Sequence, residues 1–259
     1  MKKQKIKQIF KNPELYYHLI NKSKKKIKTD DLYFLETLAG TKICVRDNVY
    51  DIRIIKEQFV DRQYFPNDVF LNFSPKVVID IGGYIGDFSI YCAENFETKV
   101  HCYEPTPQNF NILQKNIKNN KNLQEKIFIF NQGISDEDKF ISLNVQDLEG
   151  EIHASSKKNY LEEQKINIPV ISLENAISKM DEPIDLLKID TEGTEFDILE
   201  NHQKIKLSKK INYLVFEHHP FVTDYSFQMD NLVNNLRKNF QILKKTKSLI
   251  FLQSMDFGK

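Results

Sequence analysis

From about residue 76 onward, the hydrophobic positions of the chain switch repeatedly between two patterns. Short continuous apolar runs, typical of buried strands, are followed by segments whose apolar residues recur at helical spacing. The apolar runs predict core strands at 76–81, 99–103, 127–130, 184–189 and 211–216. The amphipathic segments predict helices at 88–95, 107–119, 173–179, 195–202 and 229–239. Strands that alternate with helices in this way favour an α/β fold with a mostly parallel, doubly wound sheet.

Two further pairs of strands extend this plan. The last pair, 240–243 and 248–252, is expected to form a terminal antiparallel hairpin on the parallel sheet. Strands are also predicted at 140–145 and 166–172. The polar stretch between them, 146–164, is predicted to be a long loop. Long loops in compact domains often act as lids or substrate elements.

The first part of the chain lacks this alternation and predicts short helices and one small hairpin. The predicted helices fall within 1–28, 30–38 and 57–64, and the hairpin strands are 42–45 and 49–55. The hairpin is expected to turn at Asp47 and Asn48, which are common turn residues. We therefore divide the chain into an N-terminal helical and hairpin extension, residues 1–60, and a main domain, residues 61–259.

Composition changes this picture in three respects. The chain has no run of eighteen apolar residues and begins without an apolar signal core, so we expect neither a membrane span nor secretion. Its three cysteines form no CxxC pair, which fits a reducing cytoplasm and argues against a structural zinc site. Residues 1–28 hold ten lysines and one acid, although the formal net charge of the chain is only +1. That segment could contact a membrane surface, an anionic glycan or nucleic acid, or it could be a solvated helix that aids solubility.

The segment from residue 77 to residue 104 carries the clearest chemistry. It reads VVIDIGGYIGDFSIYCAENFETKVHCYE, a strand, a glycine turn, a helix and a second strand. The turn has the form D-x-G-x-x-x-G, from Asp80 through Gly82 to Gly86. Glycine lets the backbone approach a ligand closely, and the following helix offers free N–H groups. Glu104, about twenty residues further on, is placed to accept hydrogen bonds from ribose hydroxyls.

The charges around this turn select among nucleotide ligands. The dinucleotide fingerprint G-x-G-x-x-G is absent, and Asp80 and Asp87 flank the turn, where a pyrophosphate would meet like charge. An ammonium and a sulfonium would be attracted, which favours S-adenosylmethionine over NAD or FAD or a turn that binds nothing. The predicted cofactor residues are Asp80, Gly82, Gly83, Tyr84, Gly86, Glu104, Pro105, Gly133 and Ser135.

Acids also follow two later strands, at Asp190 and Glu217. Ligands of open α/β sheets bind outside the carboxyl ends of the strands, so these acids should face the same site. Asp190, Glu217 and His218 are predicted to hold Mg²⁺ or Mn²⁺, which would lower the pKa of a substrate hydroxyl. The predicted catalytic residues are Asp190, Glu192 and His219, with Glu192 or His219 as the proton acceptor. The alternatives are that Asp190 caps a helix and that the two histidines are loop residues. Lys188 is expected to pair with a carboxylate.

Several blocks of the sequence together resemble a known family. VVIDIGGYIGDFSIY, YEPTPQNFNILQKNIKNN, IDLLKIDTEGTEFDILE and VFEHH are similar to the FkbM family of S-adenosylmethionine-dependent methyltransferases. The resemblance covers about residues 57–220, in which Glu57 and Tyr64 also fit the family pattern. It implies a Rossmann-like class I methyltransferase that acts on oxygen, with sugars, polysaccharide precursors or polyketides as substrates. Tyr84 departs from the family, because many members have Asn there.

The positions that match the family motifs carry its roles. Asp80, Gly82, Gly86 and Glu104 would be cofactor residues, and the reaction site would be lined by Asp190, Glu192 and Glu217.

These features predict an O-methyltransferase that acts on a carbohydrate hydroxyl, in a nucleotide-linked sugar or a polysaccharide precursor. One alternative is a nucleic-acid methyltransferase that uses the lysine-rich start. Against it, the N/D-P-P-Y/F/W signature of amino-methylating enzymes is absent, since Asp190 is followed by Thr191, Glu192 and Gly193. The other alternative is a non-catalytic module that binds the cofactor. The expected partner is a small-molecule or glycan substrate, and the sequence leaves a homo-oligomer open.

Overall fold

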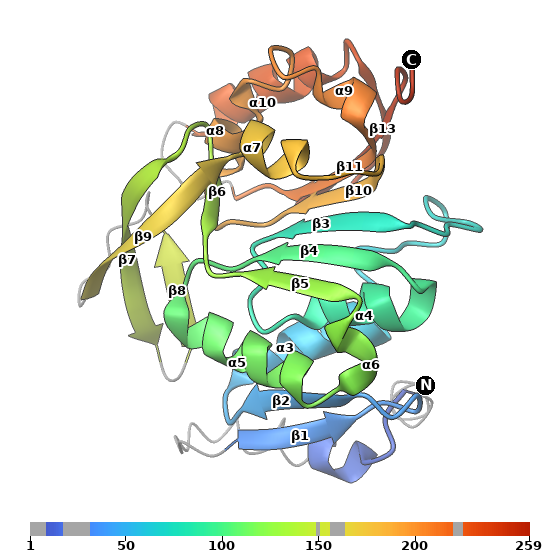
Figure 1. Cartoon of the computed structure of the whole chain (residues 1–259), viewed down its shortest axis with the longest axis vertical. Coiled ribbons are helices and arrows are strands. Elements are labelled where there is room, and N and C mark those ends of the chain that lie inside the picture. Colours follow the sequence, from blue (N-terminus) through green and yellow to red (C-terminus); the bar gives the residue numbers. More distant parts are fainter. Residues whose placement is uncertain (1–8, 18–31, 149–150, 156–163, 220–224) are drawn as a thin grey trace.

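The computed structural model describes residues 9–17, 32–148, 151–155, 164–219 and 225–259. Its centre is a seven-stranded sheet with the order β12-β13-β11-β10-β3-β4-β5 (Figure 1). The strands are β3 Val77–Ile81, β4 Lys99–Tyr103, β5 Ile127–Phe130, β10 Ile184–Ile189, β11 Ile211–Glu217, β12 Phe240–Lys245 and β13 Leu249–Ser254. Only β13 runs antiparallel to its neighbours, β11 and β12, while the pairings from β11 through to β5 are parallel. The predicted doubly wound sheet with a terminal antiparallel hairpin is confirmed.

Helices cover both faces of this sheet (Figure 1). One layer holds α4 Asp87–Phe96, α5 Pro107–Lys118 and α6 Lys121–Gln124. The other holds α7 Leu173–Ser178, α8 Glu195–Glu200, α9 Leu207–Lys210 and α10 Tyr225–Leu236. Because side chains alternate along a strand, Val78 and Val77 of β3 belong to different hydrophobic clusters. The fully apolar core strands therefore bury both faces, as expected for a parallel sheet.

A second sheet stands beyond the carboxyl ends of β3, β4 and β5 (Figure 1). Its order is β6-β9-β7-β8, and its strands are β6 Gly133–Ser135, β7 Lys139–Leu148, β8 Glu151–Ser155 and β9 Gln164–Ser172. The predicted loop at 146–164 is therefore wrong where β7 continues and β8 pairs with it. Backbone hydrogen bonds make that pairing, and the polar composition of the segment gave no sign of it. Residues 149–150 and 156–163 of the predicted loop lie outside the described residues.

The extension differs most from its prediction. Residues 32–36, predicted as helix, form β1 (Leu32–Glu36), which pairs antiparallel with β2 (Lys42–Arg46). Its sequence, LYFLE, is rich in strand-forming aromatic residues. The segment predicted as the second hairpin strand is α3 (Val49–Ile55), because the Asn48 side chain accepts a hydrogen bond from the Asp51 N–H and caps the helix. A π-helical turn, η1 (Lys56–Val60), continues α3.

Two asparagines, Asn116 of α5 and Asn120 at the start of α6, fasten the extension to the main domain. The Asn116 side chain accepts from the Cys44 N–H at 2.5 Å and donates to the Cys44 carbonyl at 3.2 Å. Asn120 makes the same two contacts with Lys42, each at 2.8 Å. These amides satisfy the edge of β2 as a neighbouring strand would. The extension's Phe59 also shares one hydrophobic cluster with the α4 and α5 layer.

Most of the lysine-rich segment, residues 1–8 and 18–28, lies outside the described residues, so the predicted contact with a membrane or glycan stays a prediction. Among the residues that are described, no helix is both long and apolar enough to cross a bilayer.

Candidate active site

A cavity of about 330 Å³ opens at the carboxyl ends of the parallel strands. Its walls come from the ends of β3, β4, β10 and β11, from α3 and η1 of the extension, and from β7 and β9 of the second sheet. Among the described residues that line it, six are acids: Glu57, Asp87, Glu104, Asp190, Glu192 and Glu217. Three are basic: Arg53, Lys188 and His219. The excess of acids makes the cavity a place for a cation.

Gly82 brings two strand ends into direct backbone contact. Its φ is +82°, and a Cβ built on it would lie 1.7 Å from the Asp190 carbonyl oxygen. The Gly82 N–H donates to the Tyr103 carbonyl at 3.0 Å, which ties the turn to β4 as well. Gly82 lines the cavity, whereas Gly83 and Gly86 do not. A Cβ on Gly83 would meet Cys102 Sγ at 2.2 Å, so that glycine permits close packing under the turn.

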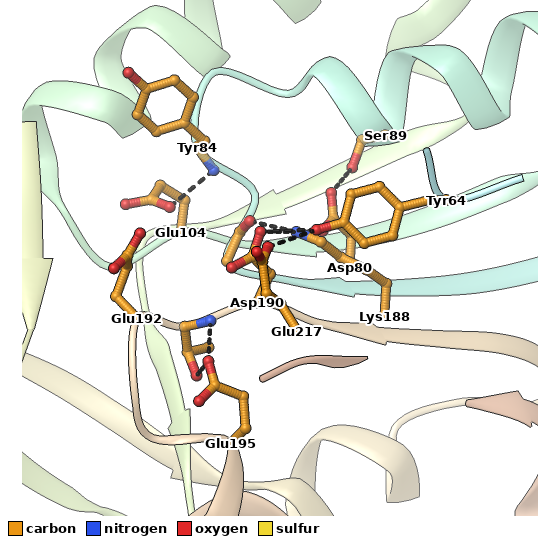
Figure 2. Close-up of polar contacts among 12 residues, drawn as sticks. Tyr64, Asp80, Tyr84, Ser89, Glu104, Lys188, Asp190, Glu192, Glu195 and Glu217 are labelled. Carbon is orange, nitrogen blue, oxygen red and sulfur yellow. Dashed lines mark hydrogen bonds and ion pairs between the residues drawn. The ribbon is translucent and has the colours of Figure 1, made fainter. Parts of the chain in front are cut away.

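Glu104 presents its carboxylate to the cavity from the end of β4. Its Oε2 accepts from the Tyr84 N–H at 2.9 Å (Figure 2). Its Oε1 accepts from the Thr106 N–H at 2.8 Å. Burial raises the pKa of Glu104 to about 7, although the two backbone hydrogen bonds act to lower it.

Of the other predicted cofactor residues near Glu104, Pro105 and Gly133 also line the cavity. Ser135 lies outside the lining and donates its hydroxyl to Asp136. An apolar wall faces this end of the cavity, built by Ile141, Leu143, Ile168 and Val170.

Asp80 lies below the cavity and not in its wall. It is fully buried, and the Ser89 hydroxyl donates to its Oδ2 at 2.6 Å. Lys188, its register partner on β10, has its Nζ 3.0 Å from Asp80 Oδ1 and donates to the Gly82 carbonyl at 2.7 Å (Figure 2). Burial disfavours the Lys188 charge, but Asp80, Asp190 and Asp87 outweigh it and raise the pKa of Lys188. The predicted pairing of Lys188 with a carboxylate is confirmed, and Asp80 acts on the turn through this lysine.

Asp190, Glu217 and His219 gather at the other end of the cavity. One potential ligand atom from each lies within 4.8 Å of the others. The Tyr64 hydroxyl donates to Asp190 Oδ2 at 2.9 Å and lies 3.4 Å from Glu217 Oε2. Burial, and then the neighbouring Asp190, raise the pKa of Glu217 to about 8, and burial also raises the pKa of Asp190.

The third member of this group differs from the predicted metal set. His219 belongs to it and His218 does not, because side chains alternate along extended backbone and only residue 219 shares a side with Glu217. Two carboxylates and an imidazole are a donor set that suits a divalent cation such as Mn²⁺. Burial raises the pKa of both acids, and a cation bound between them would stabilise their ionised forms.

Glu195, which the sequence did not single out, positions this group. Its buried Oε1 accepts from the Thr191 N–H at 2.9 Å and the Gly193 N–H at 3.2 Å, and it lies 3.0 Å from His219 Nδ1. Burial lowers the pKa of His219, but the Glu195 contact and the nearby acids outweigh this and raise it to about 10. Glu192 Oε2 is 3.9 Å from His219 Nε2 and points toward Glu104 (Figure 2). His219 is therefore an imidazolium at neutral pH until a ligand changes its surroundings.

The extension reaches the cofactor turn through Tyr84. Its φ is +49°, and its hydroxyl donates to the buried Asp51 Oδ1 at 2.8 Å. Arg46 holds the same carboxylate, with its Nη2 2.9 Å from Asp51 Oδ1, and lies over the Tyr84 ring. Nothing in the sequence joined these residues, because the contact spans 33 positions.

Parts of this chain are similar to known proteins. A family model described as "Methyltransferase FkbM domain" matches residues 80–242. The curated protein "Methyltransferase 1" of Beauveria bassiana (strain ARSEF 2860) is 26% identical over 170 residues, which is 56% of this chain and 65% of that protein.

Two solved structures are also similar. The methyltransferase FkbM from Methylobacillus flagellatus KT has 15% identity and a TM-score of 0.48, over 93% of this chain and 58% of that one. SMU.1697c from Streptococcus mutans, in complex with S-adenosylhomocysteine (SAH), has 10% identity and a TM-score of 0.46, over 75% of this chain and 96% of that one. The chain thus spans less than two thirds of the length of the curated protein and of the Methylobacillus chain.

Proposed function

Because the chain belongs to the family of methyltransferases with an FkbM domain, we propose that it transfers a methyl group from S-adenosylmethionine to a carbohydrate hydroxyl. The acceptor would be a nucleotide-linked sugar or a polysaccharide precursor. The observation that carries the proposal is the acidic cavity at the strand ends, with Glu104 at one end, Asp190 and Glu217 at the other, and Gly82 in contact with both strand ends.

The cofactor end suits the donor in charge and in shape. S-adenosylmethionine carries an ammonium and a sulfonium, and Asp87 in the cavity wall has its pKa raised by burial to about 8, so a cation there would favour its ionised form. Glu104 keeps carboxylate lone pairs for the two ribose hydroxyls. The adenine would lie near Pro105 and Gly133, against the apolar wall of the second sheet.

The acceptor end suits an alcohol. Methyl transfer is an in-line displacement, so the main contribution of the protein is to align the hydroxyl oxygen with the methyl carbon. Tyr64, Asp190 and Glu217 offer hydrogen bonds that would orient the hydroxyl. Glu192 would accept its proton, or deprotonated His219 in a site without a bound cation. A divalent cation held by Asp190, Glu217 and His219 would make the hydroxyl more acidic.

Two measurements test the proposal. Calorimetry with S-adenosylhomocysteine (SAH) should detect binding to the parent protein and a loss of at least tenfold in affinity for Glu104→Ala. The matched control, Glu125→Ala, removes an exposed acid outside the cavity and should bind as the parent does. Incubation with labelled S-adenosylmethionine and a panel of nucleotide sugars, with and without Mn²⁺, should then yield a methylated sugar.

The two parts of the proposal fail separately. A protein that does not bind SAH would contradict the cofactor assignment. Methylation that persists at full rate after exhaustive chelation would refute the role of the metal, but the proposed methyl transfer would stand.

A further inference from the structure

The π-helical turn η1 places a polar side chain in the cavity wall with nothing to bind. Gln58 is 1% exposed and lines the cavity. Neither its amide nitrogen nor its amide oxygen has a hydrogen-bond partner among the described residues. Buried side-chain amides are almost always hydrogen-bonded, and an unpaired one costs free energy. A bound molecule that supplied both partners would remove that cost.

Gln58 is unusual among the unpaired groups of the described chain. The others include Tyr16, Thr41, His101 and His202, which are outside the cavity, and Tyr103 is the only other one in its lining. Tyr103 directly precedes Glu104 and packs against Ile134 and Phe130, at the cofactor end.

The segment that carries Gln58 leads into the acceptor end through Tyr64. Glu57, the residue before it, is close enough to Asp190 for that charge to contribute to raising its pKa, after burial as the main cause. The Gln63 N–H donates to the Glu57 carbonyl at 3.0 Å, and Tyr64 follows with its hydroxyl on Asp190. A π-turn, rare in proteins and often found at functional sites, sets this register.

We propose that Gln58 recognises the acceptor by hydrogen bonds to two of its oxygens. A carboxamide carries a donor nitrogen and an acceptor oxygen on the same carbon. It therefore pairs with a ligand that has an acceptor and a donor on neighbouring atoms. A vicinal diol of a sugar ring has this property, because each hydroxyl can act in either sense. The inference rests on the proposed function and narrows it, since the acceptor must carry a second free hydroxyl beside the one that is methylated.

Gln58→Met is the sharpest variant, because methionine is of similar length and helix preference but has no hydrogen-bonding amide. We expect the urea unfolding midpoint of the variant to equal or exceed that of the parent, because the unpaired amide is gone. Affinity for SAH should stay within twofold. Binding of UDP-glucose to the SAH-loaded protein, and kcat/KM for the best sugar of the panel, should fall at least tenfold, which is about 1.4 kcal/mol. The control Gln228→Met changes an exposed glutamine of α10 outside the cavity and should leave all four values unchanged.

Each contrary result has its own meaning. A lower unfolding midpoint would show that the amide is structural, and weaker SAH binding would move Gln58 to the cofactor end. Sugar binding equal to that of the parent would also overturn the inference. A parent protein that binds SAH but no sugar would refute the diol, whereas one that does not bind SAH would refute the proposed function itself.

Discussion

Replacing Gly82 with alanine tests whether the site depends on backbone contact between β3 and β10. Two costs add at this position. The left-handed φ of +82° costs an alanine about 1–2 kcal/mol. The new Cβ would lie 1.7 Å from the Asp190 carbonyl oxygen and 2.8 Å from its carbon, which are backbone atoms and cannot turn aside. Overpacking of this kind costs about 1–3 kcal/mol more. We therefore expect a loss of about 2–5 kcal/mol from a total stability of about 5–15 kcal/mol.

The matched control is Gly40→Ala in the turn between β1 and β2. Its φ is +94°, but the nearest atom to its Cβ is the flexible Lys11 Nζ at 3.6 Å, so it should lose only the conformational part. Urea unfolding of both variants measures the difference. SAH calorimetry should show at least a tenfold loss of affinity for Gly82→Ala. The clash would push the backbone of residue 82 away from Asp190 and would disturb the hydrogen bond from Lys188 to the carbonyl of residue 82. If Gly82→Ala matched Gly40→Ala in stability and the parent in SAH affinity, the close approach would have no role in the site.

Three further predictions address charge and the extension. The pKa of Glu104 is raised to about 7, so SAH affinity should rise as the pH increases through 7, and Glu104→Gln should flatten that profile. The same raised pKa makes protonated Glu104 stabilise the unliganded protein below pH 4.5, and this stabilisation is lost as the pH rises to 7. Since the pKa of His219 is about 10, Mn²⁺ should displace a proton on binding, seen as a buffer-dependent heat in calorimetry that His219→Gln reduces. Tyr84→Phe should lose about 1 kcal/mol of stability through its bond to Asp51, and a double-mutant cycle with Asp51→Asn should show that the two losses are not additive.

The sequence predicted those parts of the fold and the site that depend on local period. The core strands came from apolar runs, and Glu104, Asp190 and Glu217 came from the rule that parallel strands end at one edge. The extension was misread because its apolar residues fit several periods, and because Asn48 looked like a turn residue when it caps a helix. The alternation of side chains along extended backbone places His219, two residues after Glu217, on the same side as Glu217. This rule could have been used on the sequence to choose His219 over His218.

The remaining parts of the site are long-range contacts that no local pattern reports. Glu195 reaches His219 across 24 positions, and Tyr84 reaches Asp51 across 33. Gln58 was missed for a different reason. Its sequence neighbours predict an ordinary helix, and only the three-dimensional structure shows that the π-turn leaves its amide buried without a partner.

The acids of the cavity also predict how the unliganded protein manages its charge. The pKa values of Asp87, Glu104 and Glu217 are raised to about 8, 7 and 8, in each case by burial first. Near neutral pH these groups therefore hold part of a proton each, while Lys188 is already committed to Asp80 and Gly82. A cation that enters the cavity takes over the neutralising role of those protons and releases them. The methyl donor is such a cation and SAH lacks its sulfonium charge, so S-adenosylmethionine should release more protons on binding than its product. An equal release for both would mean that the sulfonium does not lie among these acids.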